Sequence, residues 1–77
     1  MAAIQKLIEN LHQTQQLYAA LIEIGGQKKE AIVQNRLNDI SQLVARETKL
    51  LKELAALEQE RLNAISAYQA EIGMNSN

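Results

Sequence analysis

A break in the spacing of the apolar residues constrains the fold of this chain more than any other feature. Two runs of residues repeat at alternating steps of three and four, the spacing of one buried helix face. Between the runs, from Ile32 to Leu37, the step is five residues, so one continuous helix face cannot contain both. The predicted seam is Ile4, Leu7, Leu11, Thr14, Tyr18, Leu21, Gly25, Lys28 and Ile32, and then Leu37, Ile40, Val44, Glu47, Leu51, Leu54, Glu58, Arg61, Ile65, Tyr68 and Ile72.

The break predicts a turn between two helices. Asn35 is the residue best suited to end the first helix, because Asn tolerates the left-handed backbone conformation. Asn38 and Asp39 are expected to accept hydrogen bonds from the free N–H groups at the start of the second helix. Gly25 and Gly26 are the competing turn, but the apolar spacing passes through them in register. We therefore expect them inside a helix, at a cost of roughly 2 kcal/mol relative to alanine.

The expected fold is all-α: a single domain formed by an antiparallel two-helix hairpin that packs like a coiled coil. The expected bounds are a helix over about 3–34, a turn over about 33–38, a helix over about 37–72 and a disordered tail over 73–77. Each helix would be about 50 Å long, and a short turn requires the two to run antiparallel. The absence of Pro, with two Tyr as the only aromatic residues, also favours helices over a sheet.

Polar residues interrupt the apolar spacing, mainly in the second helix, where a buried charge would be costly. Folding the chain at the predicted turn brings Glu47 within about one turn of Lys28. It also brings Glu58 near Thr14, and Arg61 lies three residues from Glu58, a spacing that allows an ion pair. We interpret Glu58 and Arg61 as a polar layer that sets the register of the helices at some cost in stability.

The apolar stripe is wider than one partner helix requires. Residues beside the predicted seam are also apolar, and five of them are predicted to form a protein-interaction surface: Leu17, Ile24, Leu43, Leu50 and Leu57. A stripe of this width suits a three- or four-helix bundle, and two helices alone make a marginal scaffold. We expect a missing segment or self-association to complete the bundle, with a homodimer as the predicted state of the 77 residues.

The sequence lacks the groups that other function classes require. There is no Cys, and His12 is the only His, so no metal site and no cofactor are expected. Glu53, Glu58 and Glu60 have no accompanying nucleophile, so we expect no catalytic residue and no enzyme. A net charge of −1 with mixed signs disfavours nucleic acid as a partner. The longest apolar run, residues 17–22, is too short for membrane insertion, and the absence of a signal peptide favours the cytoplasm.

The span from residue 29 to 61, KEAIVQNRLNDISQLVARETKLLKELAALEQER, resembles the FlgN family of flagellar export chaperones. In that family a Lys- or Glu-rich helix end leads through an apolar pair and a polar turn into a second helix with leucine pairs and a Leu-Glu-x-x-Arg element. The matching residues are Lys28, Lys29, Ala31, Ile32, Asn35, Leu50, Leu51 and Leu57-Glu58-Gln59-Glu60-Arg61. Asn35-Arg36 replaces the commoner glycine–acid turn. Family members usually continue further, so the resemblance is to their N-terminal hairpin.

The resemblance implies a cytoplasmic type III export chaperone that binds hook–filament junction proteins and keeps them soluble and unassembled. An amphipathic terminal helix of such a client would complete the bundle by covering the spare apolar stripe. In the family, client contact is usually attributed to the segment after this hairpin, so the resemblance transfers no binding residues. The alternative is a structural coiled-coil module that only self-associates, and co-purification with a junction protein would separate the two.

Overall fold

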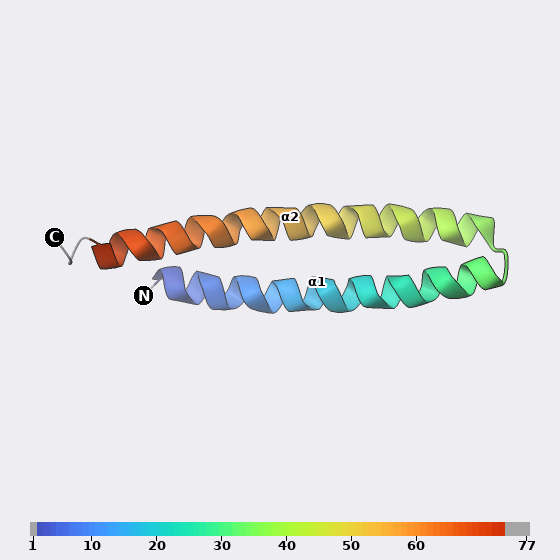
Figure 1. Cartoon of the computed structure of the whole chain (residues 1–77), viewed down its shortest axis with the longest axis horizontal. Helices are drawn as coiled ribbons and strands as arrows, with labels where there is room; N and C mark the ends of the chain where they lie inside the picture. The colour runs from blue at the N-terminus through green and yellow to red at the C-terminus, as the bar shows by residue number, and fades with distance from the viewer. Residues whose placement is uncertain (1, 74–77) are drawn as a thin grey trace.

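The computed structural model describes residues 2–73, which form two long helices packed side by side (Figure 1). Helix α1 spans Ala2–Val33 and helix α2 spans Leu37–Gly73. The helices run antiparallel, with the turn at one end and residues 2 and 73 at the other. No strand occurs among the described residues. The predicted all-α hairpin is therefore confirmed, whereas completion of a larger bundle stays a prediction.

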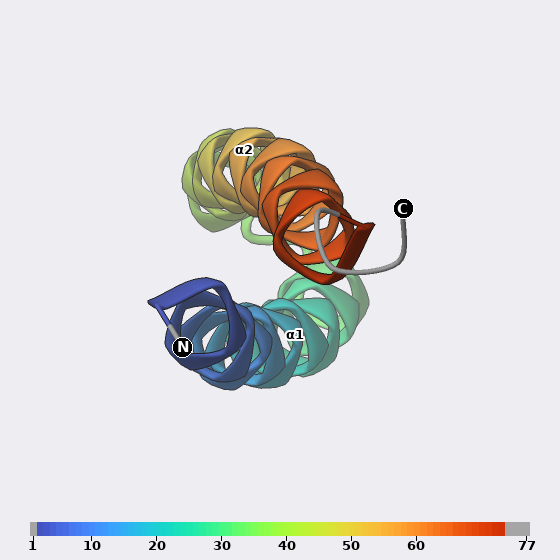
Figure 2. The same ribbon diagram turned by 90° about the vertical axis from the view of Figure 1, so that its left-hand side faces the viewer.

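The hairpin is a narrow rod, with extents of 62, 15 and 13 Å along its principal axes. Figure 2, a view along the rod, shows the two helices winding around each other. This winding lets residues spaced by seven keep facing the partner helix over many turns, as in a coiled coil. Among residues 2–73, the two elements in tertiary contact are α1 and α2.

Asn35 ends α1 in the left-handed conformation, with a φ of 56°. Its N–H donates to the carbonyl oxygen of Ile32 at 3.1 Å. The N–H of Arg36 donates to the carbonyl oxygen of Ala31 at 2.9 Å. These two bonds form the Schellman arrangement, which satisfies carbonyls that a helix end would otherwise leave unpaired. The turn thus lies within the predicted range, 33–38, and at the predicted residue.

Helix α2 begins directly after this turn. The carbonyl oxygen of Arg36 accepts the first helical hydrogen bond, from the N–H of Ile40 at 3.1 Å. The prediction that Asn38 and Asp39 accept backbone hydrogen bonds was wrong within the described residues. Instead, Asp39 Oδ2 lies 3.4 Å from Arg36 Nη1. A carboxylate in the first turn still favours the helix, because it lies at the positive end of the helix dipole.

The glycine pair lies inside α1, as predicted. Neither Gly25 nor Gly26 has a positive φ, and a Cβ added at either would meet nothing within 4 Å. The packing of the hairpin therefore does not require glycine at these positions. Helix α2 includes Gly73, one residue beyond the predicted bound, and the predicted disordered tail otherwise lies outside the described residues.

Substitutions at Asn35 should test whether the left-handed conformation controls the turn. We expect Asn35→Gly to keep or raise the free energy of unfolding, because Gly adopts this conformation without steric cost. We expect Asn35→Ala to lower it by about 1 kcal/mol, or roughly 4–8 °C in Tm, measured by circular dichroism. The control Asn38→Ala, at an exposed helical position, should change stability by less than about 0.5 kcal/mol. Equal Tm values for the Gly and Ala variants at position 35 would contradict this account.

Candidate interaction surface

The helices contact each other along one line of residues, which we call the contact seam. Every member is buried or half-buried, and the members recur at alternating steps of three and four residues. Its best-packed part lies near the turn, where Ile24, Ala31 and Leu43 are buried together against Ile40 and Leu50. The contact seam consists of Ala3, Leu7, Asn10, Thr14, Leu17, Leu21, Ile24, Lys28 and Ala31 in α1, and Ile40, Leu43, Glu47, Leu50, Leu54, Leu57, Arg61, Ala64, Tyr68 and Glu71 in α2.

The predicted seam was wrong at every second position in each helix. Predicted members such as Leu11 and Leu51 are half-exposed, at 49% and 50%. The residues one position earlier, Asn10 and Leu50, face the partner helix instead. The displaced positions carry large apolar side chains, so apolar spacing alone favours them over Asn10. The contact seam therefore combines small and polar residues such as Ala31 and Asn10 with large apolar ones such as Leu50.

The five residues predicted as a protein-interaction surface, Leu17, Ile24, Leu43, Leu50 and Leu57, all lie in the contact seam. Ile24 is 1% exposed and Leu43 is 9% exposed, because each packs against the opposite helix. These side chains are therefore engaged within the hairpin and do not form a spare surface. The cause is the same as for the wrong half of the predicted seam. The positions that were predicted to flank the seam are positions at which the two helices contact each other.

A buried polar contact joins the helices at Asn10, which the sequence reasoning missed. Asn10 is 4% exposed, and its Nδ2 donates to the main-chain oxygen of Leu57 at 2.6 Å. The hydroxyl of Thr14 donates to Asn10 Oδ1 at 3.5 Å. Since a buried amide needs its partners in place, this contact favours one axial alignment of the helices. Asn10 lies three residues after Leu7 and four before Thr14, and a polar residue at this helical spacing was the signal that could have predicted the contact.

The predicted polar layer of Glu58 and Arg61 is placed differently. Glu58 is exposed and lies outside the contact seam, which corrects its predicted place, whereas Arg61 is half-buried within it. Within residues 2–73 the two side chains form no ion pair with each other. The structure therefore assigns the buried polar contact between the helices to Asn10 in place of Glu58.

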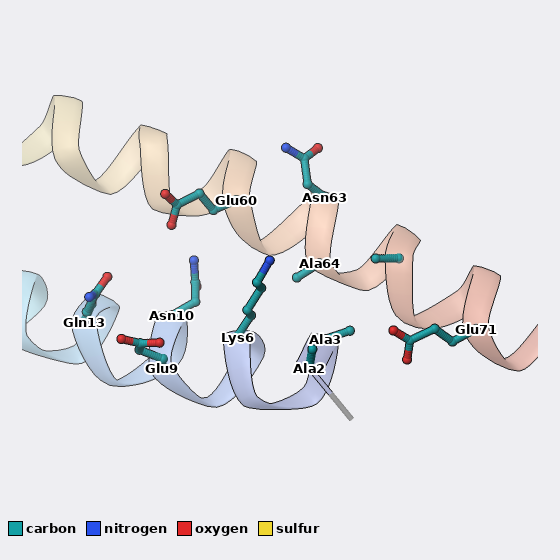
Figure 3. Close-up of a pocket in the computed structure, with 11 residues that line it drawn as sticks. Ala2, Ala3, Lys6, Glu9, Asn10, Gln13, Glu60, Asn63, Ala64 and Glu71 are labelled. Atoms are coloured by element: carbon teal, nitrogen blue, oxygen red, sulfur yellow. The ribbon is translucent and has the colours of Figure 1, made fainter.

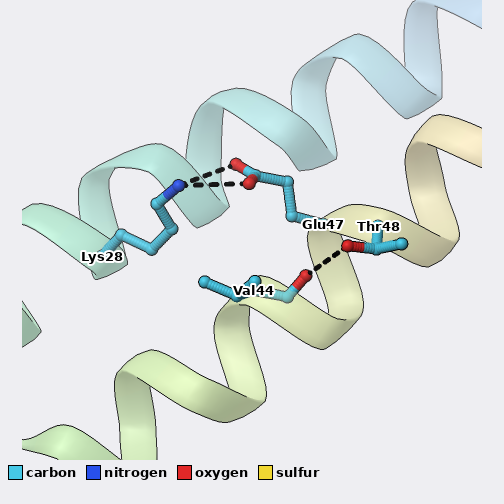
Figure 4. A network of polar contacts seen from close by, with 4 residues as sticks. All are labelled: Lys28, Val44, Glu47 and Thr48. Carbon is cyan, nitrogen blue, oxygen red and sulfur yellow. Dashed lines mark hydrogen bonds and ion pairs between the residues drawn. The ribbon is translucent and has the colours of Figure 1, made fainter.

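Lys28 and Glu47 form the charged contact across the contact seam (Figure 4). Lys28 Nζ donates to both carboxylate oxygens of Glu47 at 3.1 Å. Each side chain is 29% exposed, so water still reaches the pair and removes much of the desolvation cost. The expectation that Glu47 lies within a turn of Lys28 is correct. In this ion pair the charge of each residue compensates that of the other.

A row of large apolar side chains remains exposed immediately beside the contact seam. Within each helix its members lie at intervals that are multiples of seven residues, and all except Leu37 come one position after a seam residue. Additional apolar residues extend the row outward. We call this set the apolar face: Ile4, Ile8, Leu11, Tyr18, Ile22, Ile32, Leu37, Val44, Leu51, Leu62, Ile65 and Ile72. These side chains are 37% to 76% exposed, which marks a surface that another helix could cover.

The apolar residues of both helices lie on the same flank of the hairpin. Successive residues in a helix are rotated by about 100°, so the residue after a seam residue always points to the same flank. Two antiparallel helices are related by a rotation about an axis perpendicular to the plane of the hairpin, which keeps each flank on its own side. Equivalent positions of α1 and α2 therefore form one continuous surface.

The opposite flank is polar. A groove there is lined by Lys6, Glu9, Gln13, Glu60 and Asn63, with Ala2, Ala3, Asn10, Ala64, Ala67 and Glu71 along its floor and ends. Figure 3 shows the labelled charged and amide side chains coming from both helices. Among the described residues no group of three His, Asp or Glu is placed to hold a metal ion. Their helices also contain no segment long and apolar enough to cross a membrane.

Residues 1–77, the whole chain, match the protein family described as FlgN protein. Neither the comparison with curated proteins nor that with solved structures gave a match.

Replacing Asn10 by Asp should test the buried polar contact without changing side-chain shape. The carboxylate cannot donate to the Leu57 carbonyl oxygen and places a charge beside it, so we expect a loss of about 2–3 kcal/mol in unfolding free energy at neutral pH. The measurement is urea denaturation followed by circular dichroism. Asn63→Asp, the same change at an exposed position, should alter stability by less than about 0.5 kcal/mol. Equal losses for the two variants would show that the contact is unimportant.

Proposed function

The chain belongs to the FlgN family, and on that premise we propose that it is a cytoplasmic chaperone of the flagellar type III export system. Membership of the family implies a role in flagellar export in general. The more specific proposal is that the chain binds hook–filament junction proteins and keeps them soluble and unassembled before export. This role needs a surface for apolar client segments and no catalytic group, so we also propose that the chain is not an enzyme.

The apolar face is the observation that carries this proposal. It extends along the hairpin from Ile4 and Ile72 at one end to Ile32 and Leu37 at the other. An amphipathic helix binds such a surface through apolar residues at steps of three and four, the same periodicity that spaces the surface itself. A client helix lying along the apolar face would complete a helical bundle and lose its exposed apolar side.

The distribution of charge supports an apolar ligand. The apolar flank carries the charged residues Lys29 and Glu58, and the contact seam beside it carries the paired Lys28 and Glu47 and the half-buried Arg61. The polar flank carries most of the remaining charge, including Lys6, Glu9, Glu53, Glu60 and Arg46. Interface centres are depleted of charged residues, so the apolar face has the composition of a binding surface.

The homodimer predicted from the sequence belongs to the same proposal. Without a client, a second copy of the chain covers the apolar face and forms a four-helix bundle. A client helix and a second copy then compete for one surface, and their concentrations decide which is bound. The apolar face is thereby covered in both states.

A charge placed on the apolar face should weaken client binding. We expect Leu51→Glu to lower the affinity for synthetic peptides of the two termini of a hook–filament junction protein by at least about tenfold, because the carboxylate would be desolvated. Isothermal titration calorimetry measures this affinity. Ser66→Glu, at an exposed position outside the apolar face, is the matched control and should bind as the unmodified chain does.

Two results would contradict the proposed function. The first is a failure of the unmodified chain to bind either peptide or the intact junction protein. The second is equal binding by Leu51→Glu and Ser66→Glu, which would place the client elsewhere on the molecule.

A further inference from the structure

We infer that the client-free chain forms a dimer in which two hairpins stack their apolar faces with both turns at the same end. In this arrangement α1 of each copy packs against α2 of the other, and the two-fold axis is parallel to the rod. The inference rests on the homodimer of the proposed function and adds its geometry. The other symmetric arrangement, with turns at opposite ends, stacks α1 on α1 and α2 on α2.

The size of the apolar face fits a second copy of the chain. Full burial of a large aliphatic side chain contributes about 1.5–3 kcal/mol, which corresponds to roughly 60–120 Å² at about 25 cal/mol per Å². About half of that area remains exposed on each of the twelve side chains of the apolar face. Stacking two copies would then bury on the order of 1,000 Å² in total, which reaches the lower range of specific dimers.

Axial positions along the rod follow from contacts between the helices. Leu17 and Leu57 line the same groove, and because the helices run in opposite directions Tyr18 and Glu58 then lie within about 3 Å of the same level. The ion pair between Lys28 and Glu47 places Lys29 level with Arg46 and within about 3 Å of the level of Thr48. These two levels determine which residues of a second copy Glu58 and Lys29 would meet.

Glu58 favours turns at the same end. That arrangement keeps axial levels unchanged, so Glu58 faces Tyr18 of the second copy, whose hydroxyl is able to donate to the carboxylate. With the turns at opposite ends, the second copy is reversed along the rod. Glu58 then faces Leu51 of the second copy. A carboxylate against leucine would lose water without gaining a partner, which is unfavourable.

Lys29 favours the same arrangement independently. With the turns together it faces Thr48 of the second copy, and with the turns opposed it faces Ile8 of the second copy. The Thr48 hydroxyl donates to the Val44 carbonyl oxygen at 3.0 Å, so its oxygen is left with lone pairs for an ammonium group (Figure 4). Both polar residues therefore find polar partners in one arrangement and apolar partners in the other.

Gly25 supplies matching shape in this dimer. It occupies the same heptad position as the residues of the apolar face, and a Cβ there would meet nothing within 4 Å in the single chain. With the turns together, Leu51 of the second copy lies over Gly25. The absent side chain leaves room for that leucine, which gives a reason for a glycine that the hairpin itself does not need.

Substitution of the two neighbouring glycines tests the interface. We expect the unmodified chain to sediment as a dimer across the micromolar range. Gly25→Leu should raise the dimer Kd by at least about tenfold through overpacking, whereas Gly26→Leu, one residue round the helix, should leave it unchanged. Both changes remove a helical glycine, so circular dichroism should show equal gains in helix stability. A monomeric unmodified chain, or equal Kd values for both variants, would overturn the inference.

Cysteine crosslinking tests the orientation, because the chain has no Cys of its own. An equimolar mixture of Gly25→Cys and Leu51→Cys chains should form a mixed disulfide, and neither chain should crosslink with itself. Efficient self-crosslinking of Ala55→Cys, which lies at the middle of α2, would instead show turns at opposite ends and overturn the inference. These readouts need no client, so their failure is distinguishable from a failure to bind junction proteins.

Discussion

The rotation of each helix about its own axis, which determines the residues of the contact seam, is the constraint on which the rest of the structure depends. Ala3, Ala31 and Ala64 are buried along this seam together with larger side chains, and Asn10 reaches across to a main-chain oxygen of the other helix. The residues that directly follow seam residues then point to the apolar flank, whatever their size. Large aliphatic side chains occur in both places: Ile24 and Leu43 are buried between the helices, whereas Leu51 is half-exposed on the flank.

Two polar contacts hold the axial alignment of the helices, one toward each end of the rod. Asn10 contacts the main chain of Leu57 in the half that contains residue 2, and Lys28 pairs with Glu47 in the half that contains the turn. A shift of one helix along the other would break both contacts, whereas apolar side chains tolerate small displacements. The alignment also sets the levels of Glu58 and Lys29 on the apolar flank, and the proposed dimer geometry depends on these levels.

The hairpin separates two kinds of surface. Its polar flank keeps water around charges from both helices, and its apolar flank presents side chains that a third or fourth helix would cover. This division fits the chaperone role proposed for this member of the FlgN family, because the surface proposed to bind an apolar segment lies apart from the charged flank. A surface made of repeating side chains from two parallel rows also accepts a helix without any rearrangement of the hairpin.

The sequence by itself determined the two helices, the turn and the excess of apolar surface. The five-residue step placed the turn, and Asn35 adopts the left-handed conformation that its residue type tolerates. The contact between Lys28 and Glu47 followed from folding the chain at that point. These features depend on local conformation and on distance along the chain, which can be read without knowing how the helices are rotated.

Only the tertiary structure decided which apolar residues lie between the helices. Leu50 and Leu51 are equally apolar and adjacent, yet Leu50 packs against the core and Leu51 stays half-exposed. A stripe wide enough to cover several heptad positions permits more than one rotation of each helix about its axis. The buried amide of Asn10 favours the observed rotation, because its bond to the Leu57 main-chain oxygen exists only when both helices are in place.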